Sequence, residues 1–147
     1  MIENANTDQD IRQKIVIVED DFALADIYKI RLDLIGYKCI VARDGEEALA
    51  TIEQHKPDLV LLDLMIPKIS GGDVLKQMRQ TAWGRDIRVY IISNLNEEQA
   101  PEDLRELGIE GYTVKSNLRN DDIDNLVDAI LTPPDQDDIS LESNPNT

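Results

Sequence analysis

Four short apolar runs in this sequence each end in side chains that can do chemistry. The side chains are carboxylates after the first two runs, a hydroxyl after the third and an ammonium after the fourth. In chain order they are Glu19-Asp20-Asp21, Asp63, Ser93 and Lys115. Together such groups can hold a divalent cation, attack a phosphoryl group and offset the charge on its oxygens. The set predicts a phosphoryl-transfer site, provided that the fold brings the four run ends together.

The apolar runs themselves predict how that happens. They cover residues 15–18, 59–62, 89–92 and 112–114, and none of them alternates between apolar and polar side chains. Continuous runs of this kind are typical of strands that are buried on both faces of a parallel sheet. In such a sheet the ligand site lies outside the carboxyl ends of the strands, so the four polar groups are expected at one edge.

Helical and strand patterns alternate five times along the chain. Strands are predicted over 14–18, 37–42, 58–62, 87–92 and 109–114, and helices over 22–35, 44–55, from the loop 64–72 to about 80, 96–107 and 118–131. This order predicts a three-layer α/β fold, a doubly wound five-stranded parallel sheet with the flavodoxin-like strand order 2-1-3-4-5.

Two helices need comment. In the helix over 22–35, the inward face is expected to carry Leu24, Ile27, Ile30 or Arg31, and Leu34. The helix over 96–107 has few apolar residues, and Pro101 lacks the amide that the helical hydrogen-bond ladder needs, so its first turn is expected to fray or shift.

Length and composition fit one domain. A chain of 147 residues can bury one proper core. We expect a flexible segment over 1–12, the domain over 13–132 and an acidic, disordered tail over 133–147. A formal net charge of −15 argues against direct binding to nucleic acid. The polar N-terminus and the lack of a run of roughly 20 apolar residues indicate a cytoplasmic protein without a membrane span. Cys39, the single cysteine, is expected to be buried and inert.

Carboxylates that meet at one sheet edge repel each other, and a bound Mg²⁺ is expected to offset this repulsion. Asp20 and Asp63 are the candidate direct ligands, with the backbone carbonyl of Met65 as a third and Glu19 acting through water. Asp63 can then attack a phosphoryl group and form an aspartyl phosphate. The Lys115 ammonium would offset the negative charge on the phosphoryl oxygens. The Ser93 hydroxyl would donate a hydrogen bond to one of these oxygens.

With these residues in place, the chain resembles the receiver domain of bacterial two-component response regulators over roughly 13–132. The matching motifs are Glu19-Asp20-Asp21, Asp63-Leu-Met-Ile-Pro67 with Gly71 downstream, Ser93 and Lys115. The resemblance implies that Asp63 accepts a phosphoryl group from a histidine kinase in a Mg²⁺-dependent reaction. It also implies that Ser93 and Tyr112 form the switch pair, in which the hydroxyl moves toward the phosphoryl group and the ring turns inward.

The sequence departs from the family pattern at three positions. Ser116 follows Lys115 where proline is usual, and a serine there can cap the final helix. Asn94 follows Ser93 where the family usually has a smaller residue, and its side chain would crowd the phosphoryl oxygens. Pro101 disturbs the fourth helix, which belongs to the face that many receivers use for output.

We therefore expect a stand-alone receiver that is not an enzyme in its own right. Its expected partners are a sensor histidine kinase or phosphotransfer protein and a downstream protein target, with phosphate either switching a binding face or passing along a relay. It would be a monomer or a phosphorylation-dependent homodimer. The main alternative is a receiver-like interaction module that is never phosphorylated. A small phosphatase is disfavoured because position 65 is Met rather than a second aspartate, and a flavin carrier because the loop after the first strand is acidic.

Overall fold

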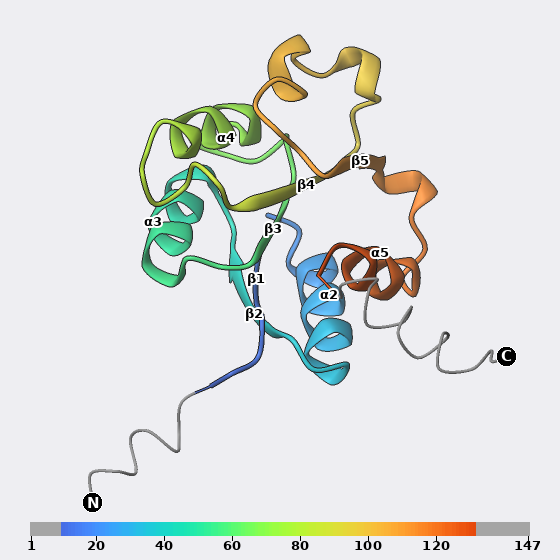
Figure 1. Cartoon of the computed structure of the whole chain (residues 1–147). Coiled ribbons are helices and arrows are strands. Elements are labelled where there is room, and N and C mark those ends of the chain that lie inside the picture. Colours follow the sequence, from blue (N-terminus) through green and yellow to red (C-terminus); the bar gives the residue numbers. More distant parts are fainter. Residues whose placement is uncertain (1–9, 132–147) are drawn as a thin grey trace, which may run out of the picture.

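The structure is a computed structural model that describes residues 10–131. Five parallel strands alternate with helices along the chain, except between β4 and β5, where 3-10 turns take the place of a helix (Figure 1). The strands are β1 Lys14–Val18, β2 Lys38–Ala42, β3 Leu59–Leu62, β4 Arg88–Ser93 and β5 Gly111–Val114. The helices are α2 Phe22–Leu34, α3 Gly45–His55, α4 Gly71–Arg79 and α5 Asp122–Leu131, and three 3-10 turns are η1 Glu97–Gln99, η2 Glu102–Leu104 and η3 Lys115–Asn117. The strand order β2-β1-β3-β4-β5 confirms the predicted doubly wound fold.

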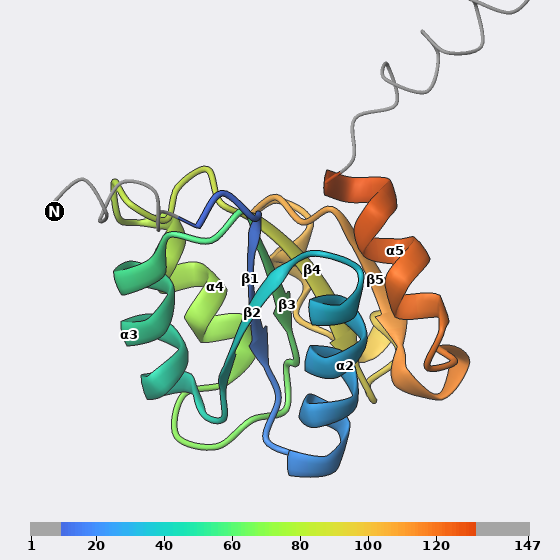
Figure 2. The same cartoon turned by 90° about the horizontal axis from the view of Figure 1, so that it is seen from below.

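The sheet is the middle of three layers. Helices α2 and α5 cover one face, and α3 and α4 cover the other (Figure 2). Successive side chains of a strand point to opposite faces, so Ile15 and Ile17 of β1 enter the core under α2 and α5, while Val16 and Val18 enter the core under α3 and α4. Burial on both faces explains why the strands read as unbroken apolar runs.

Aspartates in the loops after the strands cap the N-termini of the helices that follow. Asp21 caps α2 by accepting a hydrogen bond from the Leu24 amide at 3.1 Å, and Asp44 caps α3 through the Glu47 amide at 2.8 Å. Asp21 therefore serves the helix, which leaves Glu19 and Asp20 for the edge of the sheet.

The inward face of α2 was predicted wrongly. Its fully buried residues are Ala25, Tyr28 and Leu32. The residues expected inside are instead largely exposed, by 36% for Ile27, 58% for Ile30 and 80% for Leu34, and Leu24 is only partly buried. The helix is apolar on several sides, so the spacing alone did not decide which stripe meets the sheet.

The prediction of a helix over 96–107 was also wrong. The connection from β4 to β5 contains only the two 3-10 turns η1 and η2, and its buried residues are Ala100, between the turns, and Leu104, at the end of η2. Pro101 lies between the turns, where its missing amide costs nothing. The Arg79 guanidinium donates to the carbonyls of Leu107, at 2.7 Å, and Gly108, at 2.7 Å, and so fixes the end of this connection to α4.

The final helix begins later than expected, at Asp122 rather than near Leu118. Residues Lys115–Asn117 form the turn η3, so Ser116 does not cap this helix. The predicted tail over 133–147 and most of the predicted flexible segment over 1–12 lie outside the described residues and stay predictions.

Candidate functional site

Three of the predicted site residues meet at the carboxyl edge of the sheet. Glu19 directly follows β1, Asp63 directly follows β3 and Lys115 directly follows β5. The Lys115 ammonium donates to Asp63 Oδ2 at 2.6 Å and lies 2.8 Å from Glu19 Oε1. One cation, which follows the edge strand β5, therefore joins the carboxylates that follow β1 and β3.

This ion-paired group is largely removed from solvent. Glu19 is 2% exposed and Asp63 is 3% exposed. Burial raises the pKa of Glu19, although its bonds to Lys115 and to the Asp21 amide oppose the shift. Burial alone would lower the pKa of Lys115, but the bonds to Asp63 and Glu19 outweigh it, so the pKa of Lys115 is raised and the ammonium keeps its charge.

The carboxylates fit a divalent cation. Oxygen atoms of Glu19, Asp20 and Asp63 all lie within 4.8 Å of one another. Glu19 and Asp63 are buried, whereas Asp20 is exposed at the mouth of the group. Three ionised carboxylates and the one ammonium of Lys115 have a net charge of −2, which one Mg²⁺ would balance. We call Glu19, Asp20, Asp63 and Lys115 the acid pocket.

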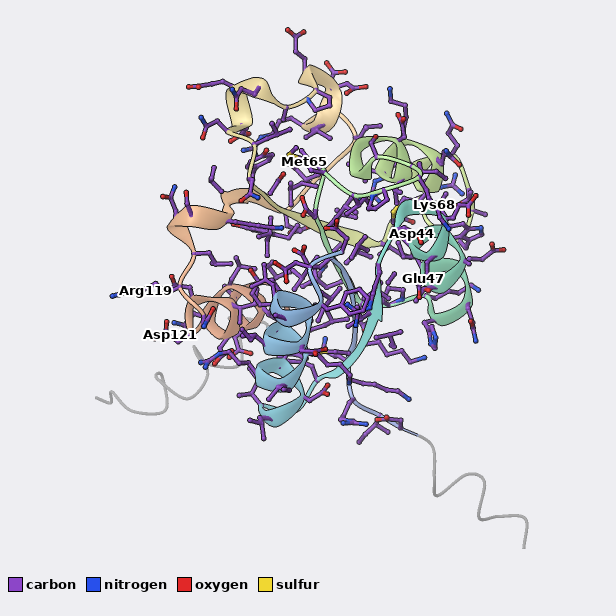
Figure 3. All side chains as sticks on the ribbon, turned by 180° about the vertical axis from the view of Figure 1, so that it is seen from behind. Asp44, Glu47, Met65, Lys68, Arg119 and Asp121 are labelled. Atoms are coloured by element: carbon purple, nitrogen blue, oxygen red, sulfur yellow. The ribbon has the colours of Figure 1, made fainter. Side chains whose placement is uncertain are left out.

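The loop after β3 and the start of α4 contact Asp63 and hold it in place. The Met65 amide donates to Asp63 Oδ1 at 3.0 Å, so the predicted ligand residue Met65 lies at the pocket, with its side chain 54% exposed. At Gly71 a β-carbon would lie 2.2 Å from the Asp63 carbonyl oxygen, so only glycine lets α4 start this close to the pocket. Farther along the loop, Lys68 Nζ lies 3.5 Å from Asp44 Oδ2, which ties the loop to the start of α3 (Figure 3).

Ser93 and Tyr112 form a second group beside the acid pocket. Ser93 is fully buried at the end of β4, where its hydroxyl oxygen accepts from the Leu95 amide at 3.3 Å. The Tyr112 hydroxyl donates to the Leu95 carbonyl at 2.7 Å. Burial raises the pKa of Tyr112, and its interaction with Ser93 opposes the shift. The tyrosine ring is therefore turned toward the end of β4, while no hydrogen bond within residues 10–131 joins Ser93 to Asp63.

The unusual residues of the motifs lie at the surface. Asn94, directly after Ser93, and Ser116, directly after Lys115, are both exposed. Sequence reasoning gave no role to two further groups near the pocket. Arg43 stacks over the Phe22 ring at 3.8 Å, and Tyr28 is buried beneath the pocket. A tyrosine at helical spacing among apolar residues reads as core packing, so the sequence held no separate signal for Tyr28.

The strand order and this edge define a doubly wound α/β domain with an acidic site at the carboxyl ends of its parallel strands. The chain matches the model of the response regulator receiver domain over residues 15–130, and it belongs to that family. It is 36% identical over 117 residues to the "Probable transcriptional regulator ycf27" of Guillardia theta, a match that covers 78% of this chain and 45% of that protein.

Solved structures of response regulators and their receiver domains are also similar to this chain. The signal receiver domain of a putative Luxo repressor protein from Vibrio parahaemolyticus is 29% identical with a TM-score of 0.73, over 88% of this chain and 98% of that one. The Mn(2+)-bound form of response regulator Rcp1 is 27% identical with a TM-score of 0.71, over 82% of this chain and 96% of that one.

The chain spans less than half the length of the curated relative from Guillardia theta. Among the residues that the structure describes, no helix combines the length and the apolar character that crossing a bilayer would take.

Proposed function

We propose that this receiver domain accepts a phosphoryl group on Asp63 in a Mg²⁺-dependent transfer from a phosphohistidine, and that the modification switches a protein-binding face. The observation that carries the proposal is the acid pocket itself, in which Asp63 is paired with Lys115 at 2.6 Å and surrounded by carboxylates with the charge balance of a divalent cation site. The donor would be a sensor histidine kinase or a phosphotransfer protein, and the exchange is expected in the cytosol.

The residues divide the chemistry between them. A carboxylate oxygen of Asp63 forms the bond to phosphorus while the bond from phosphorus to the donor's histidine nitrogen breaks, and that electron pair stays on the imidazole. Asp20 and Asp63 would hold Mg²⁺ directly together with the Met65 carbonyl, and Glu19 through water. When bound, the metal offsets charge on the phosphoryl oxygens. Lys115, already at Asp63, supplies the fixed positive charge on the other side.

The response of the domain would arise at the second group. A phosphoryl oxygen on Asp63 offers a new acceptor to the Ser93 hydroxyl, whose oxygen accepts a hydrogen bond from the Leu95 amide. A shift of Ser93 acts on Tyr112, because both residues meet at Leu95. The change would be read out on the face formed by β4, β5 and the connection between them. A partner at that face would be a downstream protein or, as a homodimer, a second copy of the domain.

The exposed stripe of α2 suits a helical phosphodonor. Ile27, Ile30 and Leu34 follow the i, i+3, i+7 spacing of an apolar helix face and are exposed by 36 to 80%. The helix starts beside the acid pocket, since Phe22 comes two residues after Asp20. A donor helix that lies against this stripe can therefore bring a phosphohistidine to the mouth of the pocket.

The direct test is incubation with acetyl phosphate and Mg²⁺, followed by intact mass measurement. We expect one added phosphoryl group on the wild type, none when Mg²⁺ is chelated and none on Asp63→Asn. An Asp86→Asn variant is the matched control, because Asp86 is an exposed carboxylate in the loop before β4, and it should label as the wild type does. No adduct on the folded wild type would instead support the alternative, a receiver-like interaction module that is not phosphorylated.

A further inference from the structure

Tyr28 lies deep under the acid pocket and has no part in the proposed transfer. It is 4% exposed and belongs to the sheet-facing side of α2. Long side chains of a helix point back toward its N-terminus. Because α2 begins at the carboxyl edge of the sheet, this tilt directs the Tyr28 ring toward the residues that follow β1 and β3.

A small cavity connects Tyr28 with the carboxylate residues. The cavity has a volume of about 10 Å³, and it is lined by Tyr28 and Glu19, by Asp63 and by apolar residues of the three central strands. This volume is about the space that one water molecule requires.

The Tyr28 hydroxyl is close enough to the pocket to sense its charges. Burial raises the pKa of Tyr28 to about 12, and the negative charge of Glu19 is the next contribution, followed by an opposing one from Lys115 and a further one from Asp63. Among the fully buried side-chain polar atoms of residues 10–131, only Arg43 Nη1 has no hydrogen-bond partner, so the Tyr28 hydroxyl is not an orphan sealed from water. Tyrosine hydroxyls inside proteins usually have a partner, and a water molecule in the cavity can serve as one.

We propose that Tyr28 is a positioning residue of the acid pocket, whose hydroxyl donates to one water molecule in this cavity, and that this water donates in turn to Glu19 and Asp63. The arrangement balances: the water accepts one hydrogen bond and uses its two hydrogens on two carboxylates, the three bonds that a buried water typically makes. The water would hold the carboxylates of Glu19 and Asp63 at a fixed separation on the side that faces Tyr28. Lys115 joins the same two carboxylates through its ion pairs.

The carboxylates have room for this contact. Glu19 already accepts from Lys115 and from the Asp21 amide, and Asp63 accepts from Lys115 and from the Met65 amide. Each ionised carboxylate has about four acceptor positions, so one further bond to each is available. The proposal rests on the function proposed above, because the pocket that Tyr28 would shape is the one that would bind Mg²⁺.

The test is the Mg²⁺ affinity of Tyr28→Phe, measured by isothermal titration calorimetry on the full chain. This variant keeps the packed ring and removes only the hydroxyl. We expect the dissociation constant for Mg²⁺ to rise by about 3- to 10-fold, the effect of one lost bond in a charged network. Tyr37→Phe is the matched control. Its hydroxyl bonds Asp128 and it belongs to the same core cluster, so Mg²⁺ binding should stay within about twofold of the wild type.

A double-mutant cycle with Glu19→Gln separates positioning from packing. If the hydroxyl acts through Glu19, Tyr28→Phe will have a much smaller effect in the Glu19→Gln background than in the wild type. An equal effect in both backgrounds, or Mg²⁺ binding by Tyr28→Phe within twofold of the wild type, would overturn the proposal. Metal binding is measured apart from phosphorylation, so failure of the wild type to accept phosphate would count against the proposed function alone.

Discussion

The Lys115 ammonium lies 2.6 Å from Asp63 and is at the same time the cation nearest to Glu19, at 2.8 Å. It therefore separates two buried carboxylates that would otherwise face each other across neighbouring strands. An ionised carboxylate is the form that acts as a nucleophile, and Lys115 places a positive charge directly against Asp63 in a site that is nearly closed to solvent.

Replacing Lys115 by methionine tests this balance. The variant leaves two buried carboxylates without their cation, so in the absence of Mg²⁺ we expect a loss of about 3 kcal/mol in the free energy of unfolding. Added Mg²⁺ should restore part of it, because the metal takes over the charge. Phosphorylation by acetyl phosphate should slow by about 100-fold. Urea titrations with and without Mg²⁺, beside mass measurements over time, would give both numbers.

Lys29→Met is the control for the Lys115 variant. Lys29 pairs with Asp33 at 2.7 Å on the surface of α2, with side chains 41% and 35% exposed, and such pairs contribute little. Equal stability of the two methionine variants without Mg²⁺ would show that Lys115 does not hold the buried carboxylates.

Neighbouring glycines in α4 should respond oppositely to alanine. At Gly71 the added β-carbon would lie 2.2 Å from the Asp63 carbonyl oxygen, whereas at Gly72 its nearest neighbour would be Pro101 Cγ at 3.5 Å. We expect Gly71→Ala to cost about 1 to 3 kcal/mol and to slow phosphorylation by displacing Asp63. Gly72→Ala should be neutral or stabilise by about 0.5 to 1 kcal/mol, because alanine is the better helix former. Urea unfolding of both variants decides, and a Gly71→Ala protein as stable and as active as Gly72→Ala would refute the steric argument.

Much of the fold and of the acid pocket was predictable, because both depend on one rule. Strands buried on both faces must be unbroken apolar runs, and side chains after parallel strands must meet at one edge. Glu19, Asp63 and Lys115 could be brought together on that rule alone, and their ion pairs bear out the convergence. Their roles in phosphoryl transfer remain proposals.

Two predictions about helices were wrong: which face of α2 is buried, and that a helix connects β4 to β5. In α2, isoleucine at positions 27 and 30 suggested an inward stripe, but the sheet takes Ala25, Tyr28 and Leu32. A helix that is apolar on several sides is oriented by its fit to the sheet, which the sequence does not display. In the connection from β4 to β5, only Ala100 and Leu104 are buried in the core, and Leu95 and Leu107 are partly buried against it, too little apolar contact to stabilise a helix.

The exposed stripe of α2 provides a prediction about the phosphodonor. Ile30→Asp introduces a charge at a side chain that is 58% exposed, so stability and labelling by acetyl phosphate should be unchanged. Transfer from a protein donor should fall by 10-fold or more if the donor packs on this stripe, because the new carboxylate would lose its solvent. The measurement is transfer from a phosphorylated kinase transmitter domain, chosen from a panel as the fastest donor to the wild type.

Ile11→Asp is the control for the docking prediction, since Ile11 is 92% exposed and lies outside α2. It should accept phosphate from the same donor at the wild-type rate. If Ile30→Asp matches it, the donor approaches the pocket from another side.

Cys39 should make the protein less stable at alkaline pH. Burial raises the pKa of its thiol from 9.0 to about 12 in the folded state. A pKa raised on folding contributes stability that is fully present below the unfolded pKa, and this contribution is lost as the pH rises through the window up to the folded pKa. From pH 9 toward 11 the contribution should therefore shrink by up to about 1.4 kcal/mol for each pH unit. Urea titrations at pH 8, 9 and 10 should show a flatter decline for Cys39→Ala than for the wild type. A parallel decline would mean that the thiol ionises as easily in the folded protein as in the unfolded chain, and rapid reaction of the native thiol with a disulfide reagent at pH 8 would point the same way.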